Sequence, residues 1–143
     1  MYLHNHSYFS LRYGTLSVEE LIANAKKLGI SSLALTDINN STGMLDFANQ
    51  CVEAGLQPIA GMEYRNGDEY LYTGIARNTE GFRELNALLT HHNITGTSLP
   101  VDADEFQNAY VIYPYEKKPQ RALKDFEYIG IKAQELNKAM REL

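Results

Sequence analysis

The chain has 143 residues, of which 44% are hydrophobic and 22% charged, enough for one domain with its own core. Its apolar runs are too short to cross a bilayer and its first ten residues lack the apolar stretch of a signal peptide, so we expect a cytoplasmic protein. The net charge of −5 argues against a primary nucleic-acid-binding surface, and the single cysteine, Cys51, excludes an internal disulfide.

The first half of the chain alternates predicted strands with predicted helices. Ser17 and Glu20 have the spacing of a capping box, so a helix should begin there, and Gly29 is a good stop signal. Asn66-Gly67 is a strong turn signal that should pair the strands on either side of it. The predicted strands are 2–6, 31–37, 57–65 and 69–78, and the predicted helices are 17–28, 43–54 and 80–91.

The second half of the chain gives weaker signals. A polar loop is expected at 93–106, strands at 110–114 and 127–132, and a terminal helix at 134–143. Basic residues gather between the two strands, and we interpret them as a solvated face rather than a binding surface. They are Lys117, Lys118, Arg121 and Lys124.

Alternation of strands and helices is typical of a parallel α/β fold with helices outside the sheet. A closed barrel of this kind needs about 200–250 residues. We therefore predict a partial, C-terminally truncated barrel, with residues 1–92 forming its core and 93–143 continuing the same domain.

Four polar side chains fall at the ends of three predicted strands. His4 and His6 end the first strand, Asp37 the second and Glu63 the third. Catalytic groups of α/β barrels gather at this end of the strands, and residues i and i+2 of a strand face the same side. Imidazole and carboxylate groups together suit Zn²⁺ or Mn²⁺, so the sequence predicts a metal site.

Each of these residues also has a purely structural interpretation. A His-x-His pair can be two satisfied surface histidines, Asp37 can cap a loop through backbone hydrogen bonds, and Glu63 can be an ordinary rim carboxylate. His91 and His92 fall at a predicted helix end, where contact with the helix dipole explains them. The agreement of three strand ends is what favours the metal site.

Three segments resemble the motifs of the PHP (polymerase and histidinol phosphatase) domain family. They are MYLHNHSYFSLRYG, SLALTDINNSTGMLDF and LQPIAGMEYR. Together with GIARNTEGFRELNALLT, they are similar to the polymerase branch, the domain that begins the alpha subunit of bacterial DNA polymerase III. The resemblance covers about residues 1–92. It implies a PHP-type, distorted barrel, with His4, His6 and Glu63 as metal ligands and Asp37 supporting the site.

The sequence also departs from the family pattern. Isoleucine stands at position 38, where the family usually has a histidine. After the first motif, positions where many family members carry a metal ligand hold Tyr8, Arg12 and Tyr13. The strand before Ala76-Arg77-Asn78, where a further histidine is expected, holds Tyr70, Leu71 and Tyr72. Arg12 would add a positive charge near the site and oppose a cation. We therefore expect a degenerate site that binds Zn, Mn or Mg weakly, or no metal.

The resemblance implies a noncatalytic PHP domain of a replicative DNA polymerase, a DNA-directed nucleotidyltransferase. Its partners would be the rest of the alpha chain, DNA through the parent enzyme, and a docked proofreading exonuclease subunit. Whether the fragment itself is an enzyme is left open: we expect it to be inactive or at most a weak metal-dependent phosphoesterase or exonuclease. The alternatives are a free-standing PHP phosphoesterase, using a metal-activated hydroxide, and a binding module unrelated to DNA.

Overall fold

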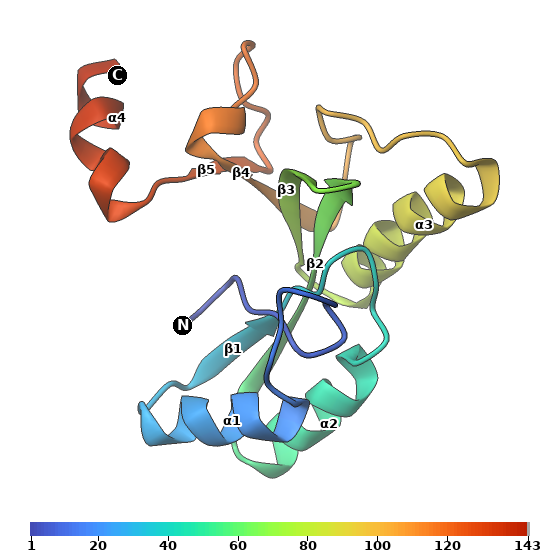
Figure 1. Ribbon diagram of the computed structural model, residues 1–143, viewed down its shortest axis with the longest axis vertical. Helices are drawn as coiled ribbons and strands as arrows, with labels where there is room; N and C mark the ends of the chain where they lie inside the picture. The colour runs from blue at the N-terminus through green and yellow to red at the C-terminus, as the bar shows by residue number, and fades with distance from the viewer. Residues whose placement is uncertain (143) are drawn as a thin grey trace.

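The computed structural model describes residues 1–142, which form one five-stranded sheet with helices packed around it (Figure 1). The elements are α1 (Val18–Lys27), β1 (Ser32–Leu35), α2 (Met44–Glu53), β2 (Gln57–Asn66), β3 (Glu69–Ala76), α3 (Thr79–Thr95), β4 (Ala109–Pro114), β5 (Glu127–Gly130) and α4 (Leu136–Glu142), with 3₁₀ turns at Tyr115–Lys117 and Ala133–Glu135. Among these residues, none of the helices combines the length and apolarity that a membrane crossing requires.

The sheet has the strand order β1-β2-β3-β4-β5. The outer pairs, β1-β2 and β4-β5, are parallel, whereas β2-β3 and β3-β4 are antiparallel. The β2-β3 pair is the hairpin that Asn66-Gly67 predicts, and Gly67 has the positive φ of 58° that such a turn needs. Five strands fall short of the eight of a closed α/β barrel, which confirms an α/β fold of the partial-barrel kind.

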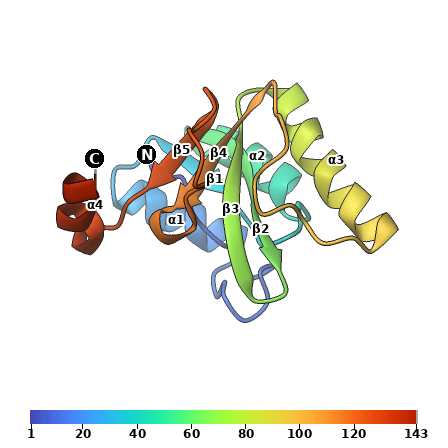
Figure 2. The ribbon, with the colours of Figure 1, turned by 90° about the horizontal axis from the view of Figure 1, so that it is seen from above.

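The helices cover the sheet as the sequence predicts. α1 begins at the capping box, in which Ser17 accepts from the Glu20 backbone and the Glu20 side chain accepts in return. α1 and α2 lie together against β1 and β2, and α3 lies beside β2 and β3. α4 lies beyond β5, far from α3 (Figure 2). The core beneath α1 and α2 includes Phe47 and the fully buried thiol of Cys51.

The first predicted strand is not a regular strand. Residues 2–6 run alongside β1, but only Tyr2 makes a ladder bridge, with Leu33. Further along, the Thr36 hydroxyl accepts from the Asn5 backbone and donates to its carbonyl at 3.0 and 3.1 Å. The Thr36 backbone N–H also donates to the Asn5 carbonyl at 2.9 Å, so the side chain adds to a backbone hydrogen bond there. The segment is extended, and it still brings its two histidines to the end of β1.

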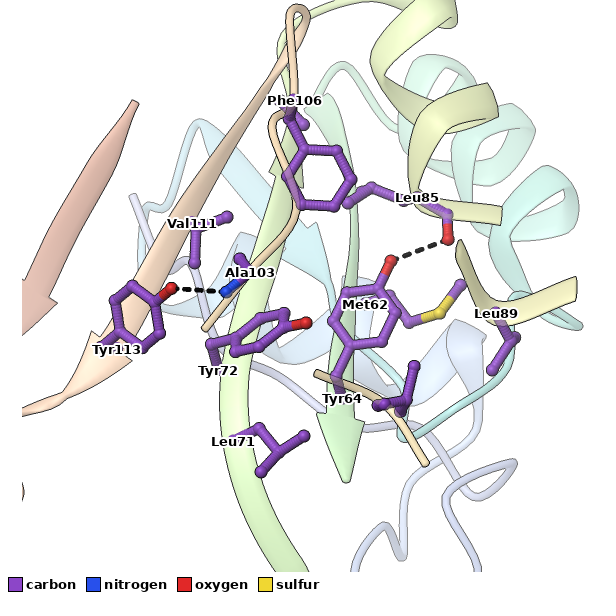
Figure 3. Packing of buried hydrophobic residues seen from close by; sticks show 12 residues of the cluster. Met62, Tyr64, Leu71, Tyr72, Leu85, Leu89, Ala103, Phe106, Val111 and Tyr113 are labelled. Atoms are coloured by element: carbon purple, nitrogen blue, oxygen red, sulfur yellow. Dashed lines mark hydrogen bonds between the residues drawn. The ribbon is translucent and has the colours of Figure 1, made fainter. Parts of the chain in front are cut away.

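A second core lies between the central strands and α3, and three tyrosines run through it (Figure 3). The rings of Tyr64 and Tyr72 lie 5.3 Å apart, and those of Tyr72 and Tyr113 lie 5.5 Å apart. Tyr64 donates to the Leu85 carbonyl, and the Tyr113 hydroxyl accepts from the Ala103 backbone. The Tyr72 hydroxyl, although buried, has no hydrogen-bond partner among the described residues.

Removing that hydroxyl should therefore stabilise the protein. We expect Tyr72→Phe to raise the free energy of unfolding by about 1 kcal/mol, because a buried, unpartnered hydroxyl is lost. Tyr64→Phe is the matched control and should lower it by about 1 kcal/mol, because its hydroxyl is paired. Urea denaturation checks both values. Equal destabilisation by the two variants would show that Tyr72 is hydrogen-bonded.

The basic residues near the end of the chain are held in ion pairs. Lys117 contacts Glu69 at 2.6 Å, and Lys118 contacts Glu142 at 2.8 Å. Arg121 contacts Glu127, and Lys124 contacts Glu105 at 3.6 Å. Each of these charges therefore has an acidic partner within the chain.

Candidate functional site

The structure brings two histidines and a glutamate together from distant parts of the chain. Glu63 lies in β2, and its backbone accepts from and donates to the segment that follows β1. Both imidazoles reach the same carboxylate oxygen of Glu63, with His6 Nε2 at 2.7 Å from Oε2 and His4 Nε2 hydrogen-bonded to that atom as well. One ligand atom from each residue lies within 4.8 Å of the others.

The Glu63 carboxylate is buried, with its side chain at 0% exposure, yet it is ionised. Burial by itself raises its pKa, but the hydrogen bonds from His4, His6 and Arg65 outweigh burial and lower the pKa to about 2. An ionised carboxylate only accepts hydrogen bonds, and the Nε of Arg65 donates to one of its oxygens. The charge of Glu63 is thereby satisfied without a metal ion.

Arg65 is the residue at this site that sequence reasoning missed. Its Nε donates to Oε1 of Glu63, the oxygen that the histidines leave free. The guanidinium lies 4.2 Å from the ring centre of Tyr13 and 5.6 Å from that of Tyr70. The available signal was the i, i+2 spacing of Glu63 and Arg65, which puts both on one face of β2.

Two tyrosines occupy the surroundings of the site. An irregularity between β2 and β3 pairs Arg65 with Tyr70, so this ring faces the site. Tyr70 stacks on His4 at 5.7 Å, and its hydroxyl is hydrogen-bonded to Thr73 at 2.7 Å. Tyr13 meets the His6 ring edge to face. Arg12, which we expected to supply the opposing charge, is solvent-exposed; Arg65 supplies it instead.

The fourth predicted ligand, Asp37, has its carboxylate turned to the loop after the histidines. It accepts from the Ser7 backbone at 2.7 Å, from the Ser7 hydroxyl at 2.6 Å and from the Ser10 hydroxyl at 2.6 Å. Gly14 closes this loop, because a Cβ there would lie 1.7 Å from the Ser7 carbonyl oxygen. Asp37 thus lies outside the three-residue group, and its role as a ligand stays a prediction.

Among the described residues, one group offers ligands for a single metal ion. His4, His6 and Glu63 offer the nitrogen and oxygen ligands that Zn²⁺ or Mn²⁺ accepts. Within the part of the chain that the structure describes, this group has fewer ligands than the cluster of several ions that the family resemblance implies. Ile38, which bridges to Glu63, offers no ligand atom, and Arg65 occupies the second carboxylate oxygen.

The fold and the site define a partial α/β barrel whose strand ends carry a histidine-carboxylate group. The PHP domain family matches residues 2–134 of the chain. The chain therefore belongs to the PHP domain family, which confirms the resemblance of its three motifs.

Curated relatives of the chain are bacterial DNA polymerases. An error-prone DNA polymerase of Symbiobacterium thermophilum is 41% identical over 90 residues, which are 63% of this chain and 8% of that protein. The DNA polymerase III subunit alpha of Treponema pallidum is 34% identical over 110 residues, covering 67% of this chain and 9% of that protein. The chain thus spans less than a tenth of the length of these relatives.

Solved structures of similar fold come from metal-dependent and hydrolytic proteins. A putative metal-dependent phosphoesterase from Bifidobacterium adolescentis has a TM-score of 0.59 at 12% identity, covering 98% of this chain and 82% of that chain. An amidohydrolase from Chromobacterium violaceum, with bound sulfate and no metal, has a TM-score of 0.51 at 26% identity over 66% of this chain and 33% of that chain. The first of these supports the fold alone.

Proposed function

We propose that this chain is the PHP domain of a DNA polymerase alpha chain that takes part in DNA replication. The similarity to polymerases of two kinds, replicative and error-prone, supports this assignment. Within such a polymerase the domain has a structural role: it stabilises the alpha chain and offers a docking surface for a proofreading exonuclease subunit. It does not itself hydrolyse phosphate esters.

The observation that supports a loss of hydrolytic activity is that protein groups contact both carboxylate oxygens of Glu63. In a working site of this kind, metal ions supply an activated hydroxide and clamp the phosphate. Here, two imidazoles and a guanidinium already engage both oxygens of the carboxylate. Ile38 stands in place of a further ligand. Within residues 1–142, the ligands that remain are too few to hold several ions.

The metal content of the protein tests the proposal. We expect protein purified without chelator to carry less than one equivalent of Zn or Mn per chain by inductively coupled plasma mass spectrometry. We also expect hydrolysis of p-nitrophenyl phosphate with added Mn²⁺ to equal that of a His6→Ala variant. Two or more equivalents of metal, or hydrolysis that His6→Ala abolishes, would overturn the proposal.

One observation favours the alternative of a metal-dependent phosphoesterase, namely the close grouping of His4, His6 and Glu63. The Mn²⁺ assay separates the two functions, because a phosphoesterase would lose activity in both His6→Ala and Glu63→Ala. The polymerase assignment has a test of its own. The reading frame should extend far beyond these residues, as in the relatives, and co-migration with the exonuclease subunit in size-exclusion chromatography tests docking.

A further inference from the structure

The geometry points to Arg65 as a built-in cation that takes the place of a metal ion at Glu63 and keeps divalent ions out of the His4–His6–Glu63 group. This inference rests on the proposed loss of the metal cluster and goes further, because it assigns the loss to one residue. Missing ligands alone would leave a weak site for one ion. With Arg65 at the carboxylate, no ion should bind at this site.

The side-chain amide of Asn39 binds both the N–H and the carbonyl of the Arg65 backbone. The Asn39 amide donates to the Arg65 carbonyl at 2.8 Å and accepts from the Arg65 backbone N–H at 2.9 Å. Asn39 itself has a φ of 49°, a left-handed conformation that asparagine tolerates better than most residues. The position of Arg65 next to Glu63 is therefore determined by the loop after β1 and not only by its own strand.

The side chain of Arg65 is held as firmly as its backbone. Only 12% of it is exposed, and its guanidinium lies against the faces of Tyr13 and Tyr70. Such cation–π contacts stabilise a cation that has lost part of its water. Tyr70 is fixed in turn by its hydrogen bond to Thr73. The Arg65 side chain is thus held in position to donate a hydrogen bond to Glu63, unlike a mobile surface arginine.

A divalent ion would meet two obstacles created by this arrangement. An arginine does not lose its proton in proteins, so its positive charge is permanent and would repel an ion bound at the same carboxylate. The Nε of Arg65 also occupies Oε1 of Glu63, so an ion could reach only the oxygen that both imidazoles already contact. Removing the charge of Arg65 removes the first obstacle and leaves the three ligands in place.

Titration of the metal-free protein with Zn²⁺ alone, by isothermal calorimetry, tests the inference. We expect no detectable binding to the wild type and about one equivalent bound by Arg65→Gln. Arg65→Lys keeps the charge and should not bind. Arg77→Gln removes an arginine that follows β3 and lies against the Tyr110 ring, and it is the charge-matched control, which should also not bind.

The outcomes separate this inference from the proposed function. Several ions bound by the wild type would contradict the proposed function. No binding by either the wild type or Arg65→Gln, or equal binding by Arg65→Gln and Arg65→Lys, would overturn the role of Arg65 alone. Arg65→Met keeps the aliphatic stem between the two tyrosines, and it replaces Arg65→Gln if circular dichroism shows that the latter is unfolded. Arg65→Gln/Glu63→Gln should lose the gained site.

Discussion

Replacing Asp37 with alanine is expected to lower the free energy of unfolding by about 4 kcal/mol, a severe effect for one side chain. The carboxylate is 2% exposed and accepts three short hydrogen bonds. Its removal leaves a backbone N–H and the hydroxyls of Ser7 and Ser10 buried without their acceptor. Each unsatisfied donor costs about 1–3 kcal/mol, and the cavity adds to this sum.

The Asp37 result also distinguishes a structural carboxylate from a metal ligand. The loss should be the same in EDTA and in excess Zn²⁺, because the three hydrogen-bond donors come from the protein. Urea denaturation in both buffers measures it. Asp46→Ala, at an exposed position in α2, is the control and should change stability by less than about 0.5 kcal/mol. A stability loss that appears only in the Zn²⁺ buffer would indicate that Asp37 binds metal.

The second large effect is expected at Glu127, at the start of β5. Arg121 donates to both of its carboxylate oxygens at 2.8 Å, and the Lys124 backbone and the Tyr113 hydroxyl donate as well. The hydrogen bonds from Arg121, which outweigh burial, lower the pKa of Glu127 from 4.5 to about 2. This carboxylate therefore ties the segment between β4 and β5 to the core.

The lowered pKa of Glu127 predicts how stability depends on pH. Because the folded pKa lies below the unfolded one, the stabilisation is present above pH 4.5 and is lost as the pH falls toward 2. The full shift corresponds to about 3 kcal/mol, and we expect about 2 kcal/mol because the Arg121 side chain is 34% exposed and its charge is screened.

Glu127→Gln measures this contribution. The wild type should exceed the variant by about 2 kcal/mol in free energy of unfolding at pH 7, and the difference should vanish near pH 2. Glu116→Gln, at an exposed position, is the control and should show no such difference. A gap between wild type and Glu127→Gln that stays constant from pH 7 to pH 2 would mean that ionisation of Glu127 does not stabilise the fold.

Most of the elements could be predicted because their signals are local. The capping box of Ser17 and Glu20, the Asn66-Gly67 turn and the apolar periodicity each depend on residues within one or two turns of chain. α3 runs four residues further than predicted, to Thr95, where Gly96 with a φ of 67° ends it. The convergence of His4, His6 and Glu63 was also predictable, because strand ends share an edge of the sheet.

The sequence by itself thus determined the elements, the family and three of the residues at the site. Only the tertiary structure decided what those residues contact, because hydrogen-bond partners of buried charges depend on segments far apart in the chain. Arg65 donates to one oxygen of Glu63, Asp37 accepts from Ser7 and Ser10, and the Thr36 hydroxyl is hydrogen-bonded to the Asn5 backbone. A buried carboxylate needs hydrogen-bond donors. The tertiary fold, and not the spacing of residues in the sequence, determines which donors lie close enough to it.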